Sequence, residues 1–330
     1  MTLSSSVKFL SPEEIASRSV GDAARLQLAD SASVFRDRAL RLRQLAAGHA
    51  MRDFLIFMAD VADAQQAVLN DARSVVLPTR ESLEKAAHEG VAPLGFLNGA
   101  LSDDWQADLN ALLQLLQQRI QGAALDVVRS LQAITPEELN QQAQKLMAGV
   151  MFGLDMAKAP LIGAALQVHW TRLVAQTLQA YPDIRFDPVA DTDVCPCCGS
   201  EPVASIAKIG AETSGVRYLH CNLCQSDWHM VRIKCTHCGS TKNITYEELE
   251  PLEGANLPTH ATPKGAVRAE CCGECGHYLK IVDMAKDPHV DPVADDLASV
   301  ALDLLVTDTG LQRHGVNYLL LWGEPAEGVS

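Results

Sequence analysis

The amino-acid sequence predicts a protein with an α + small β fold: an N-terminal all-helical domain, two tandem rubredoxin-like or zinc-ribbon modules, and a C-terminal helix. All ten cysteines of the 330-residue chain lie between positions 195 and 275. The cysteine-free part before them carries helix-start signals and apolar residues at three-to-four spacing, whereas the stretches between cysteine pairs alternate as strands do. We therefore expect a helical domain over 1–186, ribbons over 187–232 and 233–286, and a C-terminal helix and tail over 287–330.

Composition indicates a globular chain long enough for a well-buried core, with 48% hydrophobic and 21% charged residues. No apolar run approaches the roughly 18 residues that a membrane-spanning helix needs. The first ten residues lack a basic region followed by an apolar core, so no export signal is expected. We predict a cytoplasmic protein without stable membrane insertion, in which thiols stay reduced and clustered cysteines hold metal.

The net charge of −14 is spread unevenly along the chain. Residues 191–286 hold 9 Lys and Arg against 12 Asp and Glu, and residues 287–330 hold 1 against 8. A general nucleic-acid binder needs a positively charged stripe that displaces counterions. The cysteine region has no such excess, so the sequence argues against a nucleic-acid-binding zinc ribbon.

Capping residues and apolar periodicity mark the helical domain. Ser11-Pro12-Glu13-Glu14 and Thr135-Pro136-Glu137-Glu138 each place an N-cap residue before proline and acids. Tyr181-Pro182 ends the last helix and opens a linker rich in Pro and Asp that extends to Asp193. The predicted helices are 35–47, 51–69, 80–88, 103–121, 136–149 and 159–180.

Two sets of polar residues in this domain are interpreted as structural. The arginines at positions 36, 38, 41 and 43 are expected to form a solvated helix face rather than a binding patch. His169 and Trp170 lie inside a long apolar helix, which favours a place in the core or at a domain interface over a ligand role. No phosphate-binding glycine loop, Ser-His-Asp arrangement or His-Glu-x-x-His motif occurs here, so we predict no catalytic residue and no enzymatic activity.

Eight cysteines form four Cys-x-x-Cys pairs: Cys195/Cys198, Cys221/Cys224, Cys235/Cys238 and Cys272/Cys275. Two such pairs supply four thiolates, so the four pairs are the ligand set for two tetrahedral metal sites. The residue after the second cysteine of such a knuckle often needs a positive φ, which glycine adopts without steric cost. Gly199, Gly239 and Gly276 meet this need, whereas Gln225 follows the second pair and predicts a less regular turn.

Strand-like stretches separate the knuckles, as in a zinc ribbon or a rubredoxin. They are predicted at 203–209, 215–220, 228–233, 244–246 and 278–282. Sequential pairing would join the first Cys-x-x-Cys pair to the second and the third to the fourth. An interleaved pairing is the alternative, at a higher topological cost.

Six further residues lie near the knuckles. Cys197 and Cys271 are interpreted as bystanders, with a redox or ligand-exchanging role as the alternative. Four histidines come close enough in sequence to act as ligands, although eight cysteines already complete two sites: His220, His229, His237 and His277. Their expected role is hydrogen bonding around the ligands.

The chain returns to helix after Lys286. Asp291-Pro292 begins a helix that runs to about Val306, with Asp295 and Asp296 in its first turn, where the helix dipole favours acids. The same helix is a candidate for docking the ribbons onto the helical domain. Residues 317–322 are too apolar to be wholly free.

The cysteine region resembles the formate dehydrogenase accessory protein FdhE family. The resemblance rests on Cys-Pro-x-Cys-Gly-Ser-x-Pro at 195–202, Arg-Tyr-Leu-His-Cys-Asn-Leu-Cys at 217–224 and Trp-His-x-Val-Arg at 228–232. The third and fourth cysteine pairs contribute to it, as do Tyr-Leu-Lys-Ile at 278–281 and Val-Ala-Asp-Asp-Leu-Ala-Ser at 293–299. It is specific from about 190 to 305 and looser in the helical half.

The resemblance implies a cytoplasmic maturation factor that acts on the molybdenum-containing catalytic subunit of respiratory formate dehydrogenase before its export. It also implies that the eight paired cysteines bind metal in rubredoxin-like sites. Iron is favoured over zinc on the resemblance alone, because four thiolates accept either ion. A homodimer is left open. The alternatives are a rubredoxin-like electron-transfer protein that acts on the client's cofactor or thiols, and a dithiol oxidoreductase, which needs an exposed thiol of low pKa.

Overall fold

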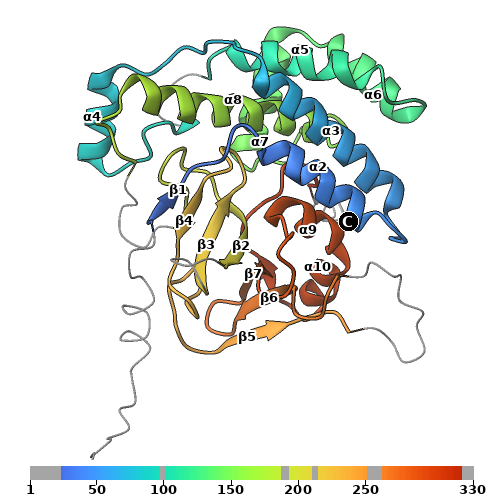
Figure 1. The fold of residues 1–330 in the computed structure, drawn as a ribbon, viewed down its shortest axis with the longest axis vertical. Helices are drawn as coiled ribbons and strands as arrows, with labels where there is room; N and C mark the ends of the chain where they lie inside the picture. Colours follow the sequence, from blue (N-terminus) through green and yellow to red (C-terminus); the bar gives the residue numbers. More distant parts are fainter. Residues whose placement is uncertain (1–23, 97–100, 187–192, 210–214, 251–261, 322–330) are drawn as a thin grey trace, which may run out of the picture.

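The computed structural model describes residues 24–96, 101–186, 193–209, 215–250 and 262–321. Helices gather at one end of the molecule and a β-sheet lies at the other (Figure 1). Of the two short C-terminal helices, the first packs between α2 and the sheet and the second packs on β6 and β8. None of the described helices is long and apolar enough to cross a membrane. The predicted combination of a helical N-terminal part and a sheet-rich C-terminal part is confirmed.

The helical part contains seven helices within the described residues. Their bounds are α2 Val34–Leu45, α3 Arg52–Asn70, α4 Arg80–Glu89, α5 Asp104–Leu116, α6 Ala123–Gln132, α7 Pro136–Met147 and α8 Ala159–Ala180. Six of them match predicted helices, whereas α6 was missed. The helix predicted to start at Ser11 lies outside the described residues.

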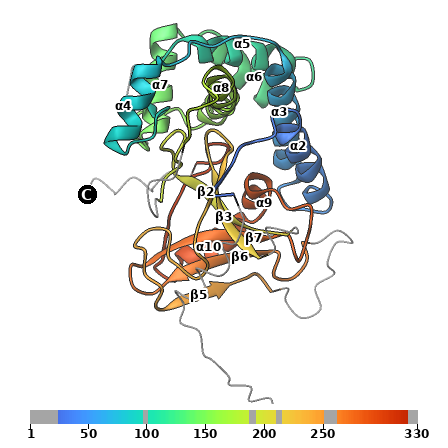
Figure 2. The same ribbon diagram turned by 60° about the vertical axis from the view of Figure 1, so that its left-hand side comes forward.

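Helix α8 is the centre of the helical part. Figure 2 views it almost end-on, with α3, α5 and α7 around it, and it packs against all three. The expected core placement of His169 and Trp170 is confirmed, because both are buried and Trp170 Nε1 donates to the carbonyl oxygen of Leu94 at 3.0 Å. A helix that is apolar on nearly all sides needs partners on nearly all sides, and α8 finds them in the helices and in the cysteine region.

The described strands form one eight-stranded sheet in the order β1-β4-β3-β2-β7-β6-β5, with β8 also pairing with β7. The strands are β1 Leu26–Gln27, β2 Pro202–Lys208, β3 Val216–Cys221, β4 Asp227–His229, β5 Ile244–Glu247, β6 Val267–Cys272, β7 His277–Asp283 and β8 Gln312–Arg313. All neighbouring pairs are antiparallel except β2–β7 and β7–β8. Strands β1, β6 and β8 were not predicted.

The two cysteine regions share this sheet instead of standing as separate tandem modules. Strand β2 of the first region pairs in parallel with β7 of the second, with Ser205 opposite Ile281 and Ala207 opposite Asp283. Backbone hydrogen bonding thus continues from one region into the other. The sequence did not indicate this pairing, because strand alternation identifies a strand but not its neighbour.

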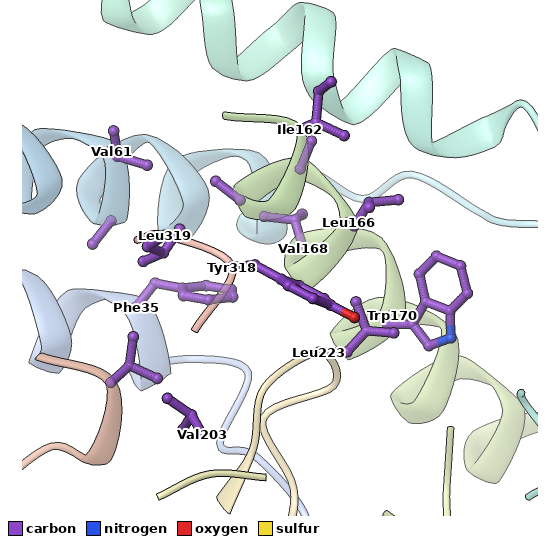
Figure 3. Close-up of a cluster of buried hydrophobic side chains, with 14 of the residues drawn as sticks. Phe35, Val61, Ile162, Leu166, Val168, Trp170, Val203, Leu223, Tyr318 and Leu319 are labelled. Carbon is purple, nitrogen blue, oxygen red and sulfur yellow. The ribbon is translucent and has the colours of Figure 1, made fainter. Parts of the chain in front are cut away.

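The hydrophobic core is continuous from the helices to the first cysteine region. Phe35 of α2, residues of α3 and α8, Val203 of β2, and Tyr318 and Leu319 of the tail lie around one another in Figure 3. The expectation that the apolar tail is not wholly free is therefore confirmed within the described residues. Tyr318 lies directly on α8, where a Cβ atom added to Gly163 would come within 2.7 Å of Tyr318 Cβ.

The interpretation of the arginine run as a solvated face is wrong for two of its members. Arg38 and Arg41 are buried, at 0% and 6% exposure, because α2 packs against the C-terminal helix α9 (Pro292–Ala298). Only Arg36 and Arg43 keep substantially exposed side chains. The predicted docking role of the C-terminal helix is thereby confirmed.

The predicted C-terminal helix is two helices, α9 and α10 (Val300–Thr307), which meet at Ser299. The Ser299 hydroxyl donates to the carbonyl oxygen of Asp295 at 2.7 Å and receives a hydrogen bond from Lys280 Nζ at 3.1 Å. Lys280 is itself buried and also pairs with Asp296 and Asp303, one from each helix. The break thus places carboxylates of both helices around one lysine of β7.

Candidate metal centres

The first cysteine cluster joins two knuckles. Cys195 and Cys198 lie in the turn before β2, Cys221 is the last residue of β3, and Cys224 lies in the turn between β3 and β4. Across the knuckles, the Cys195 and Cys224 sulfurs are 3.5 Å apart and those of Cys198 and Cys221 are 3.4 Å apart. All four sulfurs lie within 4.8 Å of one another, and all four residues are buried.

The second cluster has the same plan but a more open position. Cys235 and Cys238 lie in the turn before β5, Cys272 is the last residue of β6, and Cys275 lies in the turn between β6 and β7. The Cys235–Cys275 and Cys238–Cys272 sulfur pairs are each 3.7 Å apart. In contrast to the first cluster, Cys238 is exposed and Cys275 is half-buried.

The sulfur geometry fits a metal ion in each cluster. A metal–sulfur bond of about 2.3 Å in a regular tetrahedron places the sulfurs about 3.8 Å apart, close to the cross-knuckle separations of 3.4–3.7 Å. Burial raises the pKa of the Cys198 thiol well above its ordinary value. Thiolates in the first cluster therefore need a cation to compensate their charge. The clusters follow the sequential pairing, and either iron or zinc suits such a donor set.

The second knuckle shares the left-handed residue of the other three but is less regular, as expected. In the other three, the amide N–H of the glycine donates to the carbonyl oxygen of the first cysteine at 2.8–3.0 Å, and Gln225 makes no such bond among the described residues. Gly199, Gly239 and Gly276 have φ values of 71–72°, and Gln225 has a φ of 61°. The amide N–H of Cys221 donates to the carbonyl oxygen of Ser226 at 2.9 Å, as Cys195 does to Ser200. A non-glycine residue in this left-handed region is strained unless its surroundings fix it.

The side chain of Gln225 is fixed on both of its polar atoms. Its Nε2 donates to the carbonyl oxygens of Asn222 and Leu223 at 3.1 and 3.2 Å. Its Oε1 accepts a hydrogen bond from Arg38 Nη2 at 2.7 Å and lies 3.2 Å from His220 Nε2. The residue that replaces glycine thus connects the second knuckle to helix α2, and these contacts explain how it holds a positive φ.

Within the described residues, Cys197 and Cys271 belong to neither four-cysteine cluster. Both are buried, with the Cys197 sulfur 3.9 Å from Ser226 Oγ and the Cys271 sulfur 3.7 Å from the carbonyl oxygen of Ala269. Burial raises the pKa of Cys271 to about 11, so its thiol is neutral. A neutral, buried thiol fits the bystander interpretation and disfavours a reactive role.

The nearby histidines occupy different environments. His220 Nδ1 lies 2.6 Å from Asp227 Oδ1, and its other nitrogen faces Gln225, so it takes part in the hydrogen-bonded shell behind the second knuckle. His229 packs edge-on against Tyr218. His237 and His277 stack on each other beside the second cluster.

Sequence reasoning missed the charged residues behind the first cluster. Arg38 pairs with Asp291 at 3.1 Å, and Arg41 pairs with Asp287 at 2.8 Å and Asp295 at 2.6 Å. The available signal was the excess of acids after residue 286 together with an arginine-rich helix near the start of the chain. Opposite charges in distant segments suggest pairing but do not say which residues meet.

These features define a class of protein: a helical domain docked onto a sheet that carries two candidate four-thiolate metal centres. The chain belongs to the FdhE family. Three family models match successive parts of it: "FdhE, N-terminal" over residues 23–182, "FdhE, central domain" over 194–232, and "FdhE, C-terminal domain" over 233–320.

Curated relatives and a solved structure agree with this assignment. The chain is 36% identical over 296 residues to "Protein FdhE homolog" of Cronobacter sakazakii, and 37% identical over 296 residues to "Protein FdhE" of Salmonella typhimurium. Each alignment covers 88% of this chain and 89% of the relative. The crystal structure of the FdhE protein from Pseudomonas aeruginosa superposes with a TM-score of 0.77 at 33% identity, covering 91% of this chain and 100% of that one.

Proposed function

We propose that this protein is a cytoplasmic accessory factor that binds the molybdenum-containing catalytic subunit of respiratory formate dehydrogenase during its maturation. The observation that carries the proposal is the match to all three FdhE family models, which together span most of residues 23–320. The protein acts by binding its client, not as an enzyme. Its acidic charge of −14 directs it toward a protein client rather than nucleic acid.

In this proposal the eight paired cysteines hold two metal ions, with iron favoured over zinc. Cys195, Cys198, Cys221 and Cys224 bind one ion, and the other four paired cysteines, Cys235, Cys238, Cys272 and Cys275, bind the second. An ion in either cluster ties two knuckles together and stabilises the sheet, and an iron ion additionally exchanges single electrons. The buried first cluster suits the stabilising role, because its position in the continuous core keeps water and redox partners away.

One observation favours electron transfer as a second candidate function. The thiol-bearing residue Cys238 is exposed, so a partner can approach the second cluster closely. Electron transfer to the client's cofactor or thiols would then use this cluster, while the first remains structural. This function requires iron, because zinc has no redox chemistry.

Binding of the purified catalytic subunit to the full-length chain tests the proposal. We expect a complex by light scattering or interferometry, and restored formate dehydrogenase activity when the gene is returned to a strain that lacks its own FdhE. If no complex forms and formate dehydrogenase activity is not restored, the accessory role is contradicted. Metal analysis with a visible spectrum decides the second candidate, since two colourless zinc ions per chain would exclude electron transfer.

A further inference from the structure

Three histidines surround the open side of the second cluster. His237 lies inside the knuckle formed by Cys235 and Cys238, and His277 follows Cys275 at the start of β7. His314, just after β8, packs edge-on against His237 with ring centroids 5.4 Å apart. The first cluster, enclosed by the core, has no comparable set among the described residues.

Two of these imidazoles bring nitrogen donors next to a cluster thiol. The rings of His237 and His277 stack with centroids 3.8 Å apart and an interplanar angle of 10°. One donor atom from each of His237, Cys275 and His277 lies within 4.8 Å of the other two. Two imidazole nitrogens and one thiolate are ligands that zinc, cobalt and other borderline divalent ions accept.

The hydrogen bonding of His277 leaves a lone pair for such an ion. Its Nδ1 lies 3.0 Å from the backbone carbonyl oxygen of Cys275. Because a carbonyl oxygen only accepts, Nδ1 carries the hydrogen and neutral His277 has its lone pair on Nε2. Metal-binding histidines are commonly oriented in this way, with the ring nitrogen that does not bind the metal donating to a backbone carbonyl oxygen.

His314 provides an independent sign that this place is built for a polar ligand. It is 7% exposed, and its Nε2 is buried without a hydrogen-bond partner among the described residues. Buried ring nitrogens are normally satisfied, so an unpaired one beside two other imidazoles needs an explanation. His314 is outside the group of three residues whose donor atoms lie within 4.8 Å of one another, so it would flank a bound ion and not ligate it.

We propose that His237, His277 and the Cys275 thiolate form an accessory position for an exchangeable divalent ion of the zinc or cobalt class, beside the second four-cysteine cluster. Cys275 would bridge the two ions. A dication held by four thiolates leaves a formal charge of about −2, which attracts a further cation. Because the two rings are nearly parallel, their lone pairs do not converge, so the exposed His237 must rotate on binding while His277 stays anchored.

The proposal rests on the four-cysteine assignment of the second cluster. One titration tests the accessory position separately from that assignment. The full chain is saturated with zinc, freed of loose ions and titrated with Co²⁺, and both metals are measured after gel filtration. We expect two retained zinc ions and one added cobalt, with thiolate-to-cobalt absorption from Cys275. Changing His237→Ala and His277→Ala together should abolish the added cobalt but leave two zinc ions.

A matched control changes two exposed histidines that lie elsewhere, His88→Ala with His289→Ala, and should keep the added cobalt. Either single variant, H237A or H277A, should weaken cobalt binding by more than about tenfold. Two zinc ions without added cobalt, or added cobalt that survives the H237A/H277A change, would overturn the accessory position alone. Fewer than two zinc ions in the wild-type chain would overturn the four-cysteine assignment and the accessory position with it.

Discussion

Arg41 on α2 forms a two-pronged ion pair with Asp295 on α9. Its Nη2 lies 2.6 Å from Oδ1 and its Nε 3.0 Å from Oδ2 of the carboxylate, and both residues are buried. The partners are 254 positions apart in sequence. The pair therefore connects the helical part to the C-terminal helix, which itself packs on β2 and β7.

Removing one partner of this pair should be strongly destabilising. Arg41→Met leaves the Asp295 carboxylate buried without its cation, which costs about 3–5 kcal/mol of unfolding free energy. Arg36→Met, on the exposed side of the same helix, should change stability by no more than about 0.5 kcal/mol. Urea unfolding measures both, and equal losses in the two variants would refute the buried-pair interpretation.

The cost of Arg41→Met should depend on pH. Burial raises the pKa of Asp295 to about 6 even though Arg41 opposes the shift, so loss of Arg41 should raise it further. A carboxyl group whose folded pKa exceeds its unfolded pKa loses stability as pH rises through the folded value. We therefore expect Arg41→Met to lose less unfolding free energy relative to wild type at pH 5 than at pH 8. The opposite trend would contradict a raised pKa of Asp295 as the cause.

Gln225 combines an unfavourable backbone conformation with favourable side-chain contacts, and two substitutions separate these effects. Gln225→Ala keeps the strain at φ 61° and removes the acceptor of Arg38, so we expect a loss of about 2–3 kcal/mol. Gln225→Gly removes the same contacts but relieves the strain, and should be about 1 kcal/mol more stable than Gln225→Ala. Equal stability of the two variants in urea would show that the turn is not strained.

Metal should be held unequally by the two clusters. Cys195→Ser and Cys272→Ser should each lower the metal content by disabling one site, whereas Cys197→Ser and Cys271→Ser should leave it unchanged. In the wild-type chain a chelator should remove one ion quickly, because Cys238 is exposed, and the other slowly, because the first cluster is buried. The slow phase of metal release should be absent from the Cys195→Ser variant. If the slow phase survives in that variant, the slowly released ion belongs to the second cluster and not to the first.

Replacing Gly163 of α8 by alanine should lower the stability of the protein, although the same change usually stabilises a helix. In an exposed helix Gly→Ala gains about 1 kcal/mol, but here the new methyl group would lie 2.7 Å from Tyr318 Cβ. We expect a lower melting temperature for Gly163→Ala. The penalty should shrink when Tyr318→Gly removes the opposing Cβ, and additive effects in the double variant would show that the two sites do not touch.

Local sequence information was sufficient for most elements and for the grouping of the cysteines. Apolar periodicity located six of the seven described N-terminal helices, because a helix buries one face at a fixed repeat. The Cys-x-x-Cys spacing located the knuckles, because two intervening residues bring both sulfurs to one point. Gln225 escaped this reasoning, since its turn depends on a side chain, Arg38, that lies 187 positions away.

The sequence by itself thus determined most of the helical half and the four knuckles, which depend on neighbouring residues, and it favoured sequential pairing of the knuckles over an interleaved one. Only the tertiary structure decided that β2 and β7 join both cysteine regions into one sheet, that Arg38 and Arg41 are buried, and that the first cluster is enclosed while the second is open. The physical reason is that burial and strand pairing depend on which distant surfaces meet. The same arginine is solvated on a free helix and buried when an acidic helix covers it.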